Sequence, residues 1–214
     1  MLNLNNQDLT ARSSIYKTHL VNSLAGFKSA NLIGTISETG NTNLAIFSSV
    51  THLGASPPLV SFITRPDNVE RHTLENIKQI KQFTINQVSK DFFKAAHQTS
   101  ARYAKNECEF LQTGLEKSFI DNFKAPFVTQ SQLKYAVELI EIIPIAINNT
   151  LIVIGQITDI FCDKNVIGKD GYIDIESLGT VAISGLDGYH ISQSLARLNY
   201  AKPNLLPAPL KSES

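Results

Sequence analysis

The sequence is short of cysteine, of net charge and of long apolar runs, and each shortage argues against a class of protein. Cys108 and Cys162 are its only cysteines, and neither has a partner at a spacing typical of a metal site. We therefore expect two free thiols rather than a disulfide. Lys and Arg together number 19, as do Asp and Glu. Balanced charge gives no general attraction to nucleic acid or to an anionic membrane, so any anion site must be local.

Signals for export and for membrane insertion are missing as well. Residues 1–8 contain no basic segment followed by an apolar run, which argues against a signal peptide. No apolar run approaches the ~20 residues that a membrane-spanning helix needs. Together with the scarcity of cysteine, these absences lead us to expect a cytoplasmic protein.

Several common catalytic and nucleotide-binding patterns are absent too. The sequence has no Gly-x-Gly-x-x-Gly after a strand-like run and no Gly-x-x-x-x-Gly-Lys-Ser/Thr, which argues against dinucleotide-binding and P-loop folds. It has no Gly-x-Ser-x-Gly nucleophile elbow. Its five histidines form no His-x-His or His-Glu-x-x-His pattern, so nothing in the sequence supports a zinc site.

What is present is the composition of a chain that folds. Hydrophobic residues make up 43% of the 214 residues and charged residues 18%, so a sizeable core can form. This length is typical of one large domain, and we expect residues 1–214 to form a single domain. A polar stretch to about residue 14 and an extended tail from Pro203 lie at its ends.

The pattern of apolar runs predicts many strands and few helices. Residues 31–37 and 43–50 are β-prone runs, and Gly40-Asn41 between them tolerates positive φ, so they predict a hairpin. Residues 14–22 fit either a short helix or an extended segment. Further expected elements are a strand at 59–64 after Pro57-Pro58, a helix to about Gln82 capped by Thr73, a strand at 83–88, a helix at 91–98, a short helical piece at 119–123, a second hairpin of 133–147 and 151–161 with an Asn148-Asn149 turn, and a short helix at 191–198. Short turns between strands favour a β-barrel or sandwich.

One local cluster of donors suits a phosphate. Ser48 and Ser49 end a strand, and Arg71 immediately precedes the expected helix start at Thr73. A phosphomonoester is well served by hydroxyls, an arginine fork and the free N–H groups of a helix N-terminus. The alternative is that Thr73 only caps its helix and that the side chains of Arg65 and Arg71 are solvated.

These residues resemble the flavin reductase-like family, whose fold is the FMN-binding split barrel. The resemblance covers about residues 25–200. The matching segments are residues 43–49, Pro57-Pro58, Arg71-His72-Thr73 with Asn76-Ile77, Thr99-Ser100-Ala101, Glu109-Phe110 with Gly114-Leu115, and residues 185–190. The resemblance implies a mainly β split barrel with a few peripheral α-helices, and a homodimer that binds FMN near the subunit interface, with FAD the less favoured flavin.

The resemblance also assigns cofactor-binding residues. The implied residues are Asn43, Ala45, Ile46, Phe47, Ser48, Ser49, Arg65, Arg71, His72 and Thr73. The strand 43–49 would line the flavin. The residues that would lie on the phosphate side are Ser48, Ser49, Arg65, Arg71 and Thr73. His72 replaces an acidic residue of many relatives, and its role is open between the phosphate, the ring and solvent.

The implied activity is an FMN-dependent oxidoreductase that passes electrons from NAD(P)H to an unidentified acceptor. No catalytic residue is implied, because the cofactor itself carries the hydride. A flavin-binding carrier or redox sensor without reductase activity is the alternative, and oxidases of the pyridoxamine phosphate type share the same barrel. His97, Tyr189 and His190 either border the ring or pack.

A dimer is also expected on physical grounds. Residues 133–147 and 151–161 are rich in Ile and look apolar on both faces. One barrel interior can cover only one of those faces, so the other face predicts a contact with a second chain.

Overall fold

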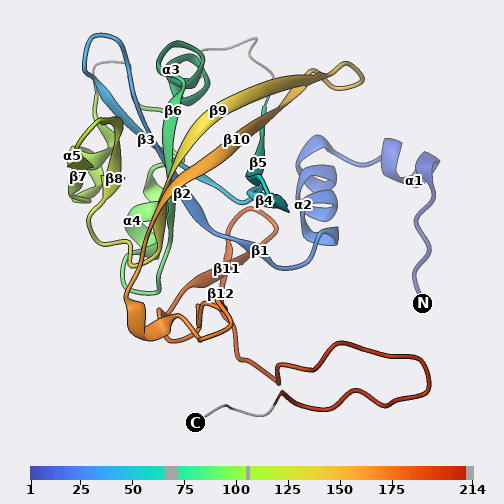
Figure 1. Ribbon diagram of the computed structural model, residues 1–214. Coiled ribbons are helices and arrows are strands. Elements are labelled where there is room, and N and C mark those ends of the chain that lie inside the picture. Colours follow the sequence, from blue (N-terminus) through green and yellow to red (C-terminus); the bar gives the residue numbers. More distant parts are fainter. Residues whose placement is uncertain (66–71, 105–106, 211–214) are drawn as a thin grey trace.

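The chain folds mainly into antiparallel β-strands in this computed structural model, which describes residues 1–65, 72–104 and 107–210 (Figure 1). Seven strands form one sheet in the order β3-β2-β6-β9-β10-β5-β4. These strands are β2 (Asn31–Ile36), β3 (Thr42–Phe47), β4 (Thr51–Ala55), β5 (Pro58–Thr64), β6 (Gln82–Gln87), β9 (Lys134–Ile145) and β10 (Thr150–Phe161). The mainly β split-barrel fold expected from the sequence is confirmed.

The two edges of this sheet meet at one corner. β3 and β4 are the edge strands, yet only Ser48, Ser49 and Val50 separate them in the chain. The Ser49 hydroxyl donates to the Ile63 carbonyl at 3.1 Å and accepts from the Ile63 N–H at 3.0 Å, which fastens the corner to β5. The sheet therefore curls into a barrel whose seam lies along β3.

Smaller elements surround this barrel. The strands β1 (Lys28–Ser29), β11 (Val181–Ser184) and β12 (Gly188–Ile191) form a three-stranded sheet, and β7 (Lys117–Ile120) pairs with β8 (Phe123–Val128). The helices are α1 (Asn6–Thr10), α2 (Ser14–Leu24), α3 (His72–Ile80), α4 (Phe93–Gln98) and α5 (Glu109–Thr113), with a 3-10 turn η1 at Lys164–Val166. None of the helices in the described ranges is long and apolar enough to cross a membrane.

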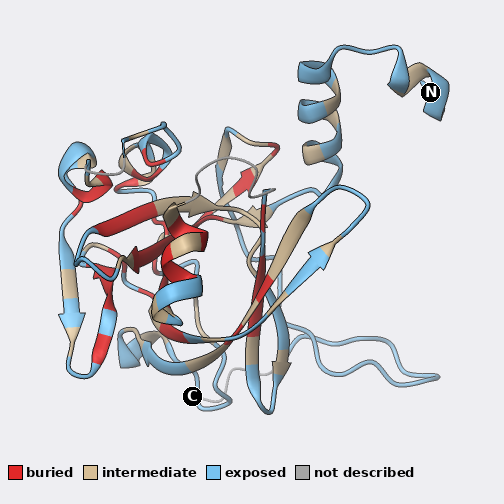
Figure 2. Cartoon of the chain, turned by 90° about the horizontal axis from the view of Figure 1, so that it is seen from above, coloured by how far each residue is buried: buried red, intermediate tan, exposed pale blue. Residues whose placement is uncertain are grey.

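The barrel interior is a continuous apolar core. Phe62 packs between Phe47 and Phe83, with ring centroids 5.0 and 5.6 Å apart, and Phe62 and Phe83 are fully buried. α3 places Leu74 and Ile77 in the same cluster. A second cluster lies beneath α4 and α5. Figure 2 shows the buried residues concentrated in the barrel and in the helix that covers it.

Close contact between strands explains one glycine. A Cβ added to Gly34 of β2 would lie 2.2 Å from the Pro126 carbonyl oxygen of β8 and 2.6 Å from the Thr84 hydroxyl. Thr84 itself donates to that carbonyl at 2.6 Å. β8 therefore crosses β2 so closely that any side chain at position 34 would push the two strands apart.

Most of the expected elements are found. Both hairpins form, and their turns contain Gly40 at φ 87° and Asn149 at φ 58°. Residues 14–22, which fitted either a helix or an extended segment, belong to the helix α2. α3 ends at Ile80 rather than Gln82, because Lys81 at φ 64° turns the chain directly into β6. The cysteines are both free.

Three local predictions are wrong. The helical piece at 119–123 is instead the end of β7, a turn at 121–122 and the start of β8, where pairing between the two strands supplies the hydrogen bonds. The helix at 191–198 does not form, because a short helix needs a surface for its apolar face and these residues lie exposed. Thr73 is not an N-cap: it lies inside α3, and its hydroxyl contacts Asn43.

Candidate functional site

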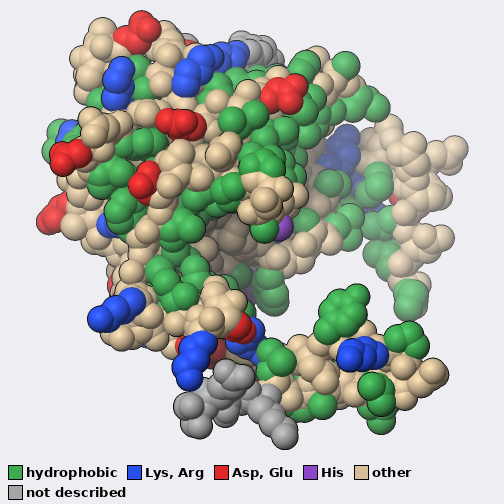
Figure 3. All heavy atoms as spheres, viewed as in Figure 1, with side chains coloured by type: hydrophobic (Ala, Val, Ile, Leu, Met, Phe, Trp, Pro, Cys, Tyr) green, Lys and Arg blue, Asp and Glu red, His purple; other side chains and the backbone are tan. Residues whose placement is uncertain are grey.

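A cavity of about 1070 Å³ opens beside β3, at the barrel seam. Figure 3 shows this face of the molecule hollowed between the barrel and α2. Of the ten residues assigned from the sequence, nine line the cavity: Asn43, Ala45, Ile46, Phe47, Ser48, Ser49, Arg65, His72 and Thr73. Arg71 falls outside the described residues. The rest of the lining comes from α2, β5, α3, α4 and the loop after it, Glu109, Thr150 of β10 and the segment 183–189.

The edge of β3 turns main-chain groups toward the cavity. In an antiparallel pair, successive residues point their N–H and C=O groups alternately toward the partner strand and away from it. The Leu44 N–H donates to the Glu109 carboxylate at 3.1 Å rather than to β2. The main-chain N–H and C=O groups of Leu44 therefore point away from β2. Those of Ile46, two residues further along, point the same way, and Ile46 lies in the cavity wall. Ile46 can thus present a donor and an acceptor to a planar ligand.

The start of β3 is held by a closed polar network. We assign the Asn43 amide with its nitrogen toward Glu109 Oε1, 3.2 Å away. Its oxygen then accepts from the Thr35 and Thr73 hydroxyls at 3.1 and 3.0 Å. Asn76 of α3 donates to the same Thr35 hydroxyl at 3.1 Å. Because all of these groups are buried and paired, β2, β3 and α3 are fixed relative to one another.

Glu109 is a site residue that reasoning from the sequence noted but gave no role. It is the first residue of α5, it is 6% exposed, and it lines the cavity. Burial raises the pKa of its carboxyl above the usual value, while hydrogen bonds from its own N–H and the Leu44 N–H and the nearby His72 oppose that rise. A single acidic residue before an apolar Phe gave no signal of contact with β3, since the two segments are 65 residues apart.

The hydroxyls predicted for a phosphate differ in availability. The Ser49 hydroxyl is already both donor and acceptor to Ile63, and that of Thr73 is bonded to Asn43. The Ser48 hydroxyl has no hydrogen-bond partner among the described residues. Ser48 lines the cavity together with Arg65 and the loop residue Ser100. Ser48 and Arg65 are therefore available to receive an anion, and Arg102 lines the same cavity.

The far wall of the cavity carries a histidine–tyrosine pair. His97 Nδ1 lies 3.0 Å from the Tyr189 hydroxyl, and the two rings meet edge to face at 5.7 Å. Burial, with a smaller effect of Asp187, raises the pKa of Tyr189 to about 12, so the phenol stays neutral at physiological pH. His190 does not line the cavity; it contacts Ser184 at 2.7 Å and Phe27. Packing therefore accounts for His190, whereas His97 and Tyr189 border the cavity.

Metal chemistry finds no support at this site. Within residues 1–65, 72–104 and 107–210, no group of three or more His, Cys, Asp or Glu side chains could hold a metal ion. The site therefore consists of a main-chain edge, an apolar wall, hydroxyls, two arginines (Arg65 and Arg102) and three histidines (His19, His72 and His97).

Comparison with known proteins agrees with this geometry. The model of the flavin reductase like domain matches residues 25–176. The chain belongs to the flavin reductase-like family. A solved structure from Shewanella frigidimarina, a proposed flavin reductase with a split barrel domain, is 51% identical, with a TM-score of 0.91 over 94% of this chain and 100% of that one. The expected family is confirmed, and with it an oxidoreductase of flavin reductase-like type.

Two more distant structures share the fold. Component B of nitrilotriacetate monooxygenase from Bacillus cereus is 19% identical, with a TM-score of 0.82 over 92% of this chain and 98% of that one. An FMN-binding protein from Thermus thermophilus, solved with 1-cyclohex-2-enone, is 14% identical, with a TM-score of 0.65 over 80% and 90%. At these identities the likeness concerns the fold alone.

Proposed function

We propose that the cavity at the barrel seam binds FMN, and that the protein uses it to pass hydride equivalents from NAD(P)H to an acceptor. The observation that carries this proposal is the outward edge of β3, which combines main-chain groups at Ile46 with an apolar wall and ends at the hydroxyl of Ser48. A flat polar-edged ring with a phosphorylated tail has the same order of chemical groups. A Thermus thermophilus protein of the same fold is named as an FMN-binding protein, so this fold can hold FMN.

Each part of the wall has a task in this proposal. The Ile46 N–H and C=O would hydrogen-bond the polar edge of the ring. Phe47, held against Phe62 at 5.0 Å between centroids, keeps water from that side. Ser48 and Arg65 would receive the phosphate, and His72 lines the same cavity. When bound, FMN supplies the hydride chemistry, so these residues bind, orient and exclude water rather than act as acid or base.

The proposal is tested in two stages. Purified protein should carry a yellow chromophore or take one up from added FMN, and the released flavin should be FMN. NADH or NADPH should then bleach the bound flavin, and an acceptor should restore its colour. Tight flavin without bleaching by either nicotinamide would replace the reductase with a flavin carrier or sensor. An absence of flavin binding would contradict the whole proposal.

Oxidation of a pyridoxamine phosphate is separated from these activities by its product. If the flavin is reduced by a pyridoxamine phosphate with oxygen as acceptor, water is consumed, an aldehyde, ammonia and hydrogen peroxide appear, and nicotinamide is not needed. We expect no such product, because NAD(P)H is the proposed donor.

A further inference from the structure

The isolated chain exposes more surface than a monomer of its size. Its accessible surface is 13676 Å² at a mass of 23.6 kDa. Folded monomers of that mass expose about 9,800 Å², so the chain has roughly 3,900 Å² in excess. One partner in an obligate homodimer buries about 1,000 to 2,500 Å². The excess is therefore large enough to form an obligate interface.

One segment that is exposed throughout is residues 193–210, which we call the C-terminal arm. Its apolar side chains face solvent almost completely: Leu195 is 100% exposed, Leu206 92% and Tyr200 90%. Figure 1 shows the arm projecting away from the barrel, and Figure 3 shows hydrophobic side chains along it. A lone exposed leucine is ordinary, but several large ones on one projecting segment indicate a contact surface.

The arm nevertheless has a defined shape. The Asn199 N–H donates to the Ala208 carbonyl at 2.9 Å, and the Leu210 N–H donates to the Arg197 carbonyl at 2.8 Å. The Asn199 side chain in turn accepts from the Ala208 N–H at 3.0 Å. These bonds join the two limbs of a narrow loop. A two-stranded ribbon is marginal in water by itself, so a shaped apolar ribbon implies a surface that covers it.

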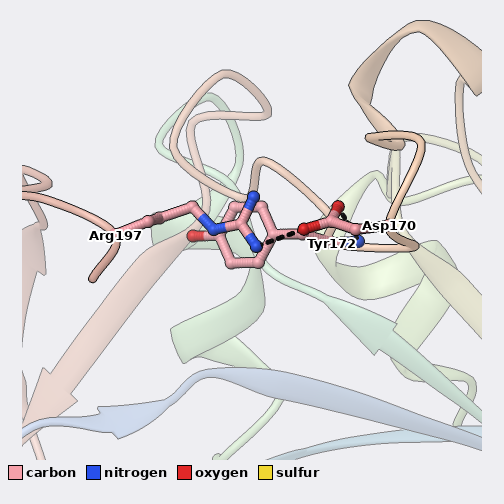
Figure 4. A network of polar contacts seen from close by, with 3 residues as sticks. All are labelled: Asp170, Tyr172 and Arg197. Carbon is pink, nitrogen blue, oxygen red and sulfur yellow. Dashed lines mark hydrogen bonds and ion pairs between the residues drawn. The ribbon is translucent and has the colours of Figure 1, made fainter. Parts of the chain in front are cut away.

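The base of the arm is anchored to its own chain. Arg197 forms an ion pair with Asp170 at 2.5 Å, and its guanidinium lies 3.9 Å from the centre of the Tyr172 ring (Figure 4). The Ser194 N–H donates to the Glu176 carboxylate at 3.0 Å. These contacts fix the direction in which the arm leaves the barrel, while residues 199–208 extend beyond them.

A second uncovered apolar surface lies at the other end of the chain. The helix α2 has no buried residue, and Ile15, Val21 and Leu24 are 73%, 55% and 76% exposed. α2 also contributes His19 and Asn22 to the wall of the flavin cavity. The helix therefore borders the site while its apolar side chains contact nothing that would bury them in the described chain.

We propose that the C-terminal arm packs against α2 of a second copy of this chain, so that two copies clasp each other by exchanged arms. Two-fold symmetry satisfies both surfaces at once, because each copy gives one arm and receives one on its own α2. The arm then lies beside the cavity rim formed by His19 and Asn22 of the partner copy, which narrows the path by which a bound ligand leaves.

Assembly state gives the first test. Light scattering should find a dimer for the full chain at micromolar concentration. Deletion of residues 193–214 should weaken dimerisation at least about 100-fold, as loss of an interface's main apolar anchors does. The triple change Leu195→Ser, Tyr200→Ser and Leu206→Ser should act likewise, whereas Leu111→Ser, 81% exposed on α5, should not. A monomeric full chain, or a dimer of unchanged affinity without the arm, would overturn the proposal.

Cross-linking identifies the contact itself. In a background with Ser at positions 108 and 162, a chain carrying Leu24→Cys and a chain carrying Leu206→Cys should form a disulfide-linked pair when mixed and oxidised. The mixture should yield several-fold more pair than either chain alone, and Leu24→Cys with Leu111→Cys should not. Equal yields in all mixtures would refute the contact between the arm and α2.

Ligand release gives a further readout, which rests on the proposed flavin function. The arm-deleted protein should lose FMN several-fold faster than the full chain while still binding it. If neither form binds FMN, the proposed function fails, and the assembly and cross-linking results still decide the arm contact.

Discussion

The barrel seam and the C-terminal arm are both made of extended chain, yet they satisfy their groups in opposite ways. At the seam, Asn43, Thr73 and Glu109 are buried, and each has partners within the same chain. In the arm, main-chain bonds are made but Leu195 and Leu206 remain almost fully exposed. Contacts within one chain therefore account for the barrel seam. The arm has a defined main-chain conformation, but no part of the described chain buries its apolar side chains.

The largest expected difference concerns stability. Phe83→Ala should lower the free energy of unfolding by about 3–5 kcal/mol, because it empties a fully buried site in the barrel core. Leu206→Ala in the arm should change it by less than about 0.5 kcal/mol. Denaturant unfolding at concentrations where the protein is monomeric measures both. Comparable losses would mean that the arm belongs to the folded core of its own chain.

The next effect sharpens the role of the β3 edge. Ile46→Pro removes the N–H that faces the cavity, at an edge position where the sheet does not use it. Loss of one buried hydrogen bond of about 1–3 kcal/mol should raise the FMN dissociation constant about 5- to 150-fold. Ile46→Val keeps the N–H and should bind FMN nearly as well as the original chain. Flavin fluorescence quenching measures the affinity, and equal loss in both variants would point to packing rather than the main-chain donor.

The third effect concerns pH. Burial raises the pKa of Glu109 in the folded state, so its stabilising contribution is complete below the unfolded pKa of about 4.3 and is lost as pH rises through the folded pKa. Glu109→Gln removes that loss, and its unfolding free energy should therefore fall less than that of the original chain as pH is raised above about 4.3. The exposed Glu107→Gln is the control. Parallel stability curves for all three proteins would contradict a buried, titrating Glu109.

The smallest effect is expected at the far wall. Tyr189→Phe removes the hydroxyl that meets His97 but keeps the ring contact with Phe93. Because the pKa of Tyr189 is raised to about 12, FMN affinity should not change between pH 7 and 10 through this residue. Titration of FMN binding in both proteins should give parallel profiles. A step near pH 10 that disappears in Tyr189→Phe would show an exposed phenol instead.

Much of the barrel could be predicted from sequence because its signals are local. The two hairpins follow from pairs of β-prone apolar runs on either side of residues with positive φ, such as Gly40 and Asn149. The prediction of a helix at 191–198 was wrong because an apolar pattern does not show whether another surface is available to bury the apolar side chains. The prediction of a helical piece at 119–123 was wrong because pairing of β7 with β8 outweighs the weak helical preference of so short a segment.

The cavity residues were predictable only in part. Residues 43–49 carry their order in the sequence, and they lie together because they form one strand and its corner. Glu109 reaches Leu44 across 65 residues, and no spacing in the sequence indicates that contact. The hydroxyls of Ser49 and Thr73 also looked available until their partners, Ile63 and Asn43, were known.

The sequence alone determined the strands of the two hairpins, β5, β6 and the family, because β-prone runs, turn residues and short motifs act over a few neighbouring positions. Only the tertiary structure decided which edge of the sheet is open, which carboxylate closes the start of β3, and which apolar residues are uncovered. Those properties depend on contacts between segments far apart in the chain, and burial exists only once the barrel has closed.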